Sequence, residues 1–455
     1  MNFPADLLSQ DLISRVLDEA RQLLVTPGIR VSDPEALRLL KDSGAEINDD
    51  IVHISDELIQ KALTTVPHEF DLFNRNGQPA VHYGGDTLQF DPGSCAPHFL
   101  DPETGEHRNS TSADLINIIK VTEMLPEFAA QSTAVVCHDA PKESGDVHRL
   151  QLVLEYSNKP VVTGAFSSQG IRPMIGLLTA HAGSAGALRA KPRAIFDVCP
   201  SPPLHWTDFA CRCLIELGRA GIPVEMVSMP LAGATAPVTL IGAVTQHAAE
   251  SLTGIVIHQL ASPGAPIVWG GAPAIFDMRT GAAPMGAIET AMICAAYARV
   301  GKSLGLPTHA YLCASDSKAL DAQAGMESGM TVLLGVMAGI NMISGAGMLD
   351  FLNCFSLEKL VLDAEAIAMA QRLLIGIDTP QSSLALGTFA QIGLTADFLK
   401  LKETRQLFRQ EQHLPSSVID RASLRTWQES GNQDAARRTK DRVKELLMQY
   451  NKPLG

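Results

Sequence analysis

The sequence has few aromatic side chains and no cluster of basic ones. Aromatic residues make up 5% of its 455 positions and only three are tryptophan. The formal net charge is −13, and no run of lysine and arginine is dense enough to follow a phosphate backbone, so nucleic acid is not expected as a partner. The amino-terminal segment lacks the basic stretch and apolar core of a secretory signal peptide. These absences favour a cytoplasmic protein.

Metal-binding and membrane signatures are also missing. The eight cysteines are scattered without a Cys-x-x-Cys pair, and no Cys/His pair has the spacing of zinc ligands. We therefore expect buried, reduced thiols and no bound metal. Residues 328–349 carry no charge and are long enough to span a bilayer. Their glycines, serines and Asn341 are more typical of a buried helix followed by a buried strand, so no membrane association is expected.

Several catalytic motifs are incomplete or absent. Gly301–Ser303 resembles the end of a phosphate-binding loop, but Ala296 stands where the first glycine of that loop belongs. Neither Gly-x-Gly-x-x-Gly nor Gly-x-Ser-x-Gly occurs. Asp146-x-His148 begins like the motif of cobalamin-carrying domains, yet Gln151 replaces its glycine. The chain is not expected to carry its own corrinoid.

Short apolar segments alternate with stretches of helical periodicity along the middle of the chain. Eight such segments occur: Thr87–Phe90, Ser132–Cys137, Pro160–Phe166, Ala194–Cys199, Ile222–Met229, Ala265–Gly270, Pro307–Cys313 and Asn341–Ser344. This alternation predicts an α/β fold, a (β/α)8 TIM barrel. We expect a mainly helical N-terminal cap over 1–85, the barrel over 86–375, and a C-terminal helical extension over 376–455.

Residues just past the strand ends of such a barrel line its mouth, where chemistry is placed. Trp206 and Trp269 fall there, and an aromatic ring face attracts a cation by roughly 0.5–2 kcal/mol. The predicted substrate-binding set is Trp206, Trp269, Phe166, Phe276, Tyr311, His138, His205 and Ser344, and the catalytic candidates at the mouth are Asp316, Lys318 and Gln323. For each side chain a structural role is the alternative. Asp197 and Glu225, which lie within strands, are favoured as structural partners because a buried carboxylate must be paired.

Several segments resemble the trimethylamine:corrinoid methyltransferase family. Residues 230–239 and 315–325, which follow the fifth and seventh strands, carry the resemblance together with 358–363. The tail adds Thr404-Arg405-x-x-Phe408-Arg409, Pro415-Ser416, Asp420-Arg421 and Trp427. The tail departs from the family at Ala396-Asp397-Phe398-Leu399, where Gly-His-Phe-Leu is expected. The resemblance spans nearly the whole chain.

Founding members of that family contain pyrrolysine, whereas this sequence has only the twenty standard residues. It is therefore similar to the branch that demethylates quaternary amines such as glycine betaine, proline betaine or carnitine. The resemblance implies methyl transfer to cob(I)alamin held by a separate corrinoid protein, with no tightly bound cofactor. Because the charge on nitrogen disappears during transfer, a carboxylate at the ammonium would stabilise the ground state, and aromatic rings are expected there instead.

Other interpretations stay open from the sequence. The barrel could be a non-catalytic betaine-binding protein, or another barrel enzyme such as a zinc-dependent corrinoid:thiol methyltransferase. An amphipathic segment near the C-terminus, RTKDRVKELLMQY, favours self-association into a homo-oligomer.

Overall fold

Eight parallel strands form a cylinder at the centre of the chain. The computed structural model describes residues 7–377, 384–394 and 397–451. The barrel strands are β6 (Gln89–Pro92), β9 (Gln131–Ser132), β10 (Val161–Thr163), β11 (Ala194–Val198), β13 (Val224–Ser228), β15 (Ile267–Gly271), β17 (His309–Tyr311) and β18 (Met342–Ala346). They form two parallel ladders, β15-β13-β11-β10-β9 and β17-β18-β6.

Two contacts join these ladders into a ring. A parallel bridge pairs Trp269 with Thr308, and the N–H of Ala129, just before β9, donates to the carbonyl of Phe90 in β6 at 2.9 Å. Gly345 in β18 has a φ of 123°, and a Cβ there would lie 2.1 Å from the carbonyl oxygen of Leu312, so only glycine allows this close approach. The predicted (β/α)8 architecture is confirmed.

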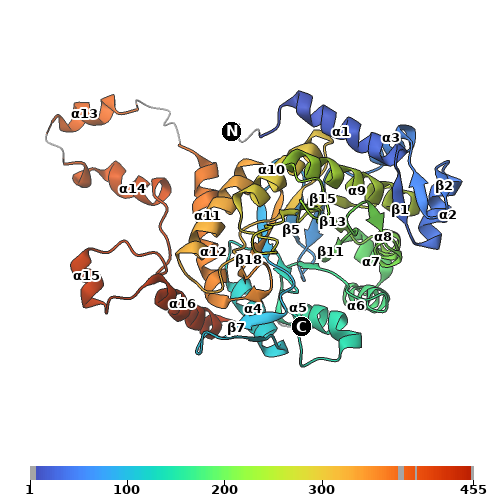
Figure 1. Cartoon of the computed structure of the whole chain (residues 1–455). Helices are drawn as coiled ribbons and strands as arrows, with labels where there is room; N and C mark the ends of the chain where they lie inside the picture. The colour runs from blue at the N-terminus through green and yellow to red at the C-terminus, as the bar shows by residue number, and fades with distance from the viewer. Residues whose placement is uncertain (1–6, 378–383, 395–396, 452–455) are drawn as a thin grey trace.

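A helix follows each barrel strand and covers the outside of the cylinder (Figure 1). These helices are α4 (Ser112–Met124), α5 (Gly145–Tyr156), α6 (Ile171–Ala182), α8 (Asp208–Ala220), α9 (Leu240–Ala261), α10 (Ile288–Ser303), α11 (Ala322–Met337) and α12 (Leu357–Ile375). Their starts are fixed by local capping: the side chains of Thr207, Thr239 and Asp321 accept N–H bonds at the starts of α8, α9 and α11. A short helix, α7 (Ala185–Ala190), and a 3₁₀ turn, Lys142–Ser144, complete this layer.

The segment before the barrel contains both helices and strands. Its elements are α1 (Gln10–Val25), β1 (Ile29–Val31), α2 (Pro34–Asp42), β2 (Glu46–Asn48), β3 (Ile51–His53), α3 (Asp56–Leu63), β4 (Phe70–Phe73) and β5 (Pro79–Tyr83). The small sheet has the order β12-β1-β3-β2, where β12 (His205–Trp206) comes from the barrel. The hairpin β4–β5 closes the amino-terminal end of the cylinder, where Leu72 and Val81 pack on strand side chains.

Additional short strands lie on the carboxyl-terminal face of the barrel. One sheet has the order β19 (Met348–Leu349), β20 (Cys354–Phe355), β7 (His98–Leu100) and β8 (His107–Asn109). A second pair joins β14 (Leu231–Ala232) to β16 (Ala274–Ile275). These additions follow the strand ends and therefore frame the barrel mouth.

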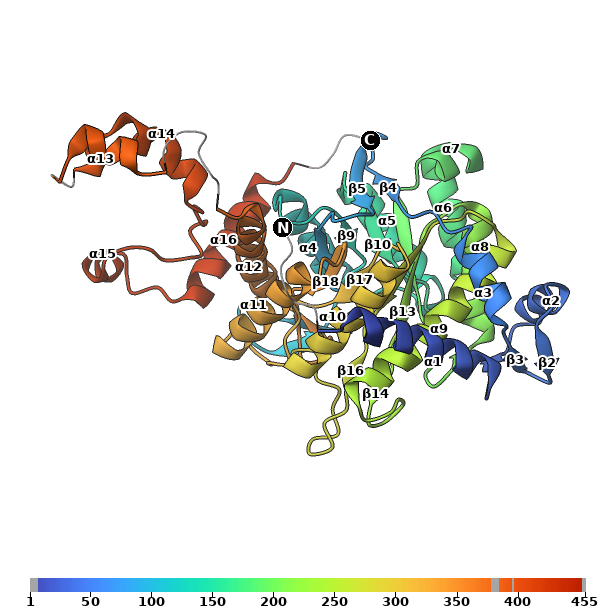
Figure 2. The same ribbon diagram turned by 90° about the horizontal axis from the view of Figure 1, so that it is seen from above.

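The chain after α12 forms an arm that extends away from the barrel (Figure 2). It consists of α13 (Leu386–Ile392), a 3₁₀ turn (Phe398–Lys400), α14 (Lys402–Glu411), α15 (Leu424–Glu429) and α16 (Ala435–Gln449). Helix α16 returns to the body, where the Tyr450 hydroxyl that follows it donates to the carbonyl of Tyr156 at 2.5 Å. Ala396, part of the departure from the family pattern, lies outside the described residues.

Among the described helices, only α9 is long and apolar enough to cross a membrane, and 83% of its most apolar window is buried inside the protein. It packs between α8, α10 and α1, so its apolar character belongs to the core. The charge-free stretch 328–349 forms the second half of α11, a turn and β18, as predicted from its glycine and serine content.

Candidate functional site

The barrel interior is built in layers, because successive side chains of a strand point to opposite faces. The lowest layer is apolar and consists of Val162, Ile195, Val268 and Met342, packed against the β4–β5 hairpin. One pleat higher along the strands, the inward positions are polar. This change from apolar to polar within a closed core marks the start of the candidate site.

The polar layer contains three carboxylates, a histidine and a serine: Asp91, Asp197, Glu225, His309 and Ser344. Ser344 Oγ donates to Asp91 Oδ1 at 2.5 Å and lies 2.9 Å from His309 Nε2. Asp197 and Glu225 are register partners on the adjacent strands β11 and β13, so both carboxyl groups face the interior at one height.

Two tyrosines bind this pair of carboxyl groups. The Tyr83 hydroxyl, reaching up from the hairpin, donates to Glu225 Oε1 at 2.6 Å. The Tyr311 hydroxyl donates to Asp197 Oδ2 at 2.9 Å. The remaining oxygens, Asp197 Oδ1 and Glu225 Oε2, have no hydrogen-bond donor among the described residues, and each carboxyl group influences the pKa of the other.

Burial governs the charge of the layer. Desolvation raises the pKa of Asp197 to about 6 and holds the pKa of Asp91 and Glu225 well above their usual range. The nearby carboxylates add to the upward shift of Glu225. Burial lowers the pKa of His309 to about 3, so its ring is neutral near pH 7. The layer therefore has acidic character with no compensating cation from His309.

A cavity of about 360 Å³ lies above this layer, at the carboxyl ends of the strands. Asp197 and Tyr311 form part of its lining, and Phe166, Met229 and Leu352 contribute apolar surface. Three cysteines, Cys95, Cys199 and Cys213, are also present in the wall. We call this cavity the mouth pocket. It combines one accessible carboxylate with a mainly apolar wall, a composition suited to a small organic cation.

The two tryptophans predicted for an aromatic cage lie elsewhere. Trp206 and Trp269 are both fully buried, and neither lines the mouth pocket. Their indole N–H groups donate to the carbonyls of Glu250 and Tyr297, each at 3.0 Å. Both rings therefore face the helical layer, a position that argues against the predicted cation cage.

The reason is strand alternation and a matching glycine on each helix. In β15 the inward positions are Val268 and Gly270, which turns Trp269 outward. A Cβ at Gly301 of α10 would lie 2.6 Å from the Trp269 ring, and a Cβ at Gly254 of α9 would lie 2.5 Å from the Trp206 ring. The rings fill space that glycine leaves open, and their role is packing.

The structure separates the other predicted binding residues. Phe166 and Tyr311 line the mouth pocket, and Ser344 lies in the polar layer beneath it. Phe276 is in the loop after β16, where its N–H donates to the carbonyl of Ala232 at 3.0 Å. His138 is exposed and contacts the carbonyl of Pro97 at 3.0 Å. His205 lies 2.8 Å from Ser32 Oγ in the cap sheet, away from the pocket.

The three catalytic candidates are brought together on the rim. Asp316, Lys318 and Gln323 line a second cavity of about 450 Å³ beside the mouth. Asp316 Oδ1 accepts the N–H groups of Met285 and Gly286 at 2.8 and 3.1 Å, and burial raises its pKa to about 6. These contacts hold a loop in place.

The other two candidates face solvent at this rim. Lys318 Nζ lies 3.9 Å from the Phe351 ring centroid and 3.5 Å from Asp350. Gln323 Nε2 donates to Glu327 Oε1 at 2.8 Å. None of the three candidates lines the mouth pocket itself, so the rim and the pocket are separate features of the same face.

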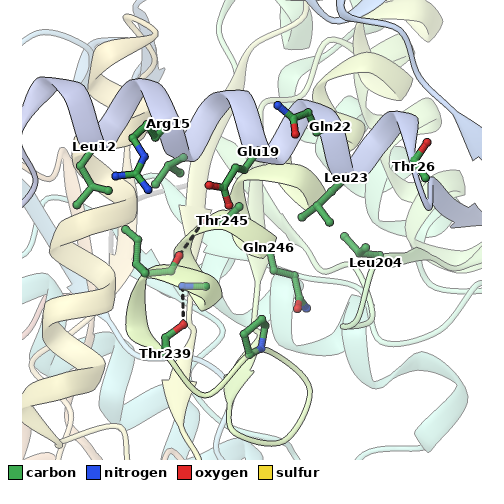
Figure 3. A pocket seen from close by; sticks show the side chains of 14 residues that line it. Leu12, Arg15, Glu19, Gln22, Leu23, Thr26, Leu204, Thr239, Thr245 and Gln246 are labelled. Atoms are coloured by element: carbon green, nitrogen blue, oxygen red, sulfur yellow. Dashed lines mark hydrogen bonds between the residues drawn. The ribbon is translucent and has the colours of Figure 1, made fainter.

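Another groove, of about 720 Å³, is lined by α1 and by the loops that precede α9. Figure 3 shows it between α1 and the start of α9, with Arg15, Glu19 and Thr245 on its walls. Its Gln246 amide is already bound to the carbonyl of Thr235 and to Glu250, both at 2.9 Å. The groove lies outside the barrel and brings no reactive set of side chains together.

Sequence reasoning missed the polar layer as a functional unit. Asp197 and Glu225 were recognised as carboxylates within strands but assigned to structural pairing, and Tyr83 was not singled out. The signal that could have found them is an acidic residue at an inward strand position in two successive strands. In the described structure these two form no ion pair with lysine or arginine.

No group of three or more His, Cys, Asp or Glu side chains in the described parts of the chain is arranged to hold a metal ion. Fold and pocket together define a (β/α)8 barrel with an acidic floor beneath a small cavity at its mouth. The sequence comparisons place this barrel in a family. The family model described as trimethylamine methyltransferase (MTTB) matches residues 2–454, and the chain belongs to that family.

Named relatives agree over nearly the full length. Trimethylamine methyltransferase MttB of Methanosarcina barkeri is 32% identical over 454 residues, covering 98% of this chain and 91% of the relative. Glycine betaine methyltransferase of Desulfitobacterium hafniense (strain Y51) is 27% identical, covering 98% and 93%. The crystal structure of the monomethylamine methyltransferase MtmB of Methanosarcina barkeri superimposes with a TM-score of 0.56 at 12% identity, covering 98% of this chain and 88% of that one. The chain is thus a methyltransferase with this barrel fold.

Proposed function

We propose that this methyltransferase takes a methyl group from a quaternary ammonium compound and passes it to cob(I)alamin on a separate corrinoid protein. The mouth pocket is the proposed substrate site. The observation that carries the proposal is the Asp197 carboxyl group, held by Tyr311 on the floor of a small, mainly apolar cavity. The glycine betaine methyltransferase relative supports a quaternary substrate.

The side chains of the pocket divide the binding task. Asp197 and the face of Phe166 attract the cationic head, while Met229 and Leu352 surround its methyl groups. The Arg149 guanidinium lies against one face of the Phe166 ring, 4.8 Å from the ring centroid. Because Phe166 is 64% exposed, its other face is open to a ligand. Held in this way, one N-methyl group can be directed towards the open mouth.

A carboxylate at the ammonium differs from the expectation of aromatic rings alone. It stabilises the charged substrate and therefore opposes loss of that charge in the transition state. The polar layer limits this effect, because Asp197 accepts a hydrogen bond from the Tyr311 hydroxyl and because burial and the nearby carboxylates raise the pKa of Glu225, which favours its neutral form. The arrangement binds a cation while keeping the net negative charge beneath it small.

The corrinoid, when docked, supplies the nucleophilic cobalt that accepts the methyl group. The chain's own contribution is an open mouth flanked by the rim residues Lys318 and Phe351, which face solvent beside the pocket. In this proposal the rim contacts the partner protein and the pocket contacts the amine. No side chain needs to protonate the leaving group, because a quaternary nitrogen departs as a neutral amine.

The test is a demethylation assay. Purified protein, a panel of corrinoid proteins and reduced cobalamin are mixed with individual quaternary amines, and methylation of cobalamin is followed by absorbance. Substrate-dependent methylation supports the proposal. Binding of the amines without methylation by any carrier would replace it with the non-catalytic binding protein, and a corrinoid that copurifies with the chain would contradict the separate carrier.

We also propose that the chain self-associates through α11 and α12. Met326, Met330 and Leu333 of α11 are 60%, 53% and 38% exposed, and Met369 and Leu373 of α12 are 39% and 43% exposed. Met326, Met330 and Leu333 recur at helical spacing on α11, and exposed apolar side chains in this pattern on two helices that pack together are typical of a protein interface. Light scattering should give a mass above that of one chain, and Met330→Lys should reduce it. A wild-type monomer would contradict the proposal.

A further inference from the structure

We infer that the mouth pocket selects ammonium substrates that carry no carboxylate, such as quaternary ammonium alcohols or alkylammonium ions, and disfavours amino-acid betaines. This inference rests on the proposed function and narrows its substrate class. It follows from the distribution of charge around the pocket, which attracts a cation at the floor and offers no counter-charge for an anion on the walls.

The walls contain no basic side chain. Of the described residues that line the mouth pocket, none is lysine, arginine or histidine, and Asp197 is the single acidic one. The thiols do not alter this balance, because burial raises the pKa of Cys199 and of Cys213 to about 12 and keeps both neutral. A carboxylate attached to the bound ammonium would therefore lose water and gain no ion pair.

The guanidinium of Arg149, which contacts the pocket residues Phe166 and Cys95, already has partners. Arg149 lies behind the pocket, 2% exposed. It donates to Asp146 Oδ1 at 3.0 Å and to the carbonyl of Thr133 at 3.1 Å, and lies 3.0 Å from Cys95 Sγ. Its charge is balanced by the Asp146 carboxylate, and the Phe166 ring covers it. It is not free to bind a substrate anion.

The start of α8 also reaches the pocket, and a helix N-terminus ordinarily favours anions. Here that position is occupied. Thr207 caps the helix by accepting the N–H of Ala210 at 3.2 Å, and Asp208 supplies a carboxylate in the first turn. Asp33 brings a second carboxyl group against Asp208, and burial with this contact raises the pKa of Asp33. Asp208 is paired with Arg212 at 3.0 Å, so the cation beside this helix start already has its own carboxylate.

The polar atoms that remain are neutral. Ser94 and Ser201 contribute hydroxyl groups to the lining, and a hydroxyl can donate to or accept from an alcohol on the substrate. A trimethylammonium head near Asp197 with a short hydroxyl-bearing or alkyl arm therefore matches both the charge and the hydrogen-bonding groups of the pocket. An arm ending in a carboxylate matches neither.

The direct test compares three ligands with the same cationic head. Tetramethylammonium, choline and glycine betaine are titrated into the full-length protein by calorimetry at pH 8, and each is offered in the demethylation assay. We expect choline or tetramethylammonium to bind at least tenfold more tightly than glycine betaine. Equal or tighter binding of the betaine overturns the inference but leaves the proposed function standing. If none of the three binds or is demethylated, the proposed function itself fails.

A gain-of-function variant provides the second arm. Met229 lines the pocket and is 39% exposed, so Met229→Lys introduces an ammonium at the wall that can pair with a substrate carboxylate. The matched control is Met448→Lys, at a methionine that is 79% exposed on α16. We expect Met229→Lys to shift the affinity ratio towards glycine betaine by at least tenfold and the control to leave it unchanged. An unchanged ratio in both variants contradicts the inference.

Discussion

The charge of Asp197 provides the sharpest test of the proposed site. Asp197→Asn keeps the shape of the side chain and its capacity to accept the 2.9 Å hydrogen bond from the Tyr311 hydroxyl, but removes the negative charge. Two unit charges about 5 Å apart attract by about 3 kcal/mol at an effective dielectric constant of about 20. Solvent screening and the hydrogen bond from Tyr311 reduce this figure, so we expect a loss of about 1.5–3 kcal/mol, or roughly 10- to 100-fold in cation affinity.

The pH dependence follows from the same group. Because the pKa of Asp197 is about 6 in the folded protein, its carboxylate is protonated below that pH and ionised above it. Wild-type affinity for choline or tetramethylammonium should therefore rise between about pH 5 and pH 7 and level off above. The Asp197→Asn variant should show no such rise. Calorimetric titrations at several pH values measure both effects.

Stability should change in the opposite direction. The folded pKa of Asp197 is raised above its ordinary value of 3.8, so the folded state binds this proton more tightly than the unfolded chain. Stability from this group is present at low pH and is lost as the pH rises from about 4 to about 6. Removing the charge should stabilise the protein at pH 8 by about 1–3 kcal/mol, a gain typical of substitutions at functional sites.

The control is Asp56→Asn, which removes an exposed carboxylate paired with Arg21 at 3.1 Å in the cap. It should change neither cation affinity nor its pH profile. If Asp197→Asn binds the cations within threefold of wild type at pH 8, the mouth pocket is not the cation site. If affinity falls but the thermal midpoint falls as well, the charge of Asp197 is stabilising and the assignment of its pKa is wrong.

Three further substitutions separate binding from packing. Tyr311→Phe removes the 2.9 Å hydrogen bond to Asp197. Because that bond lowers the pKa of Asp197, the midpoint of the pH–affinity profile should move upward and affinity at pH 7 should fall about 3- to 10-fold. An unmoved midpoint in calorimetry contradicts this. Trp269→Phe should cost about 1–3 kcal/mol in urea unfolding because its ring is fully buried, with unchanged cation affinity; weaker binding would restore the aromatic cage. Lys359→Met breaks the buried ion pair with Asp363 at 2.6 Å and should lower the free energy of urea unfolding by about 3–5 kcal/mol. A loss below 1 kcal/mol would instead show that Asp363 becomes protonated at little cost.

Most of the fold could be predicted from the sequence. Runs such as Ala194–Val198 and Val224–Ser228 are rich in β-branched residues and lie between helix-forming stretches, and both form barrel strands. Such alternation determines the architecture because parallel strands need a crossover helix between them. The short strands β7, β8, β19 and β20 were not predicted as a sheet, since two- and three-residue strands carry little periodicity and form by long-range pairing.

The residues of the candidate site could be predicted from the sequence only in part. Phe166 and Tyr311 follow strand ends and reach the mouth pocket, as their position along the chain predicts. Trp269 also lies near a strand end, but its direction depends on which face of the pleat points inward. In a parallel sheet buried on both faces, the sequence shows no alternation of apolar and polar residues. The sequence therefore does not reveal which residues of a strand point into the barrel and which point outward.

The sequence by itself determined the barrel, its family resemblance and the region of the mouth. These features depend on the local propensities of the residues and on the order of the segments, and both are properties of the sequence itself. Tertiary structure decided the chemistry within that region: it turned both tryptophans into the helical layer and brought Asp197, Glu225, Tyr83 and Tyr311 together. Residues from distant segments acquire a common pKa environment only once closure of the barrel removes their water.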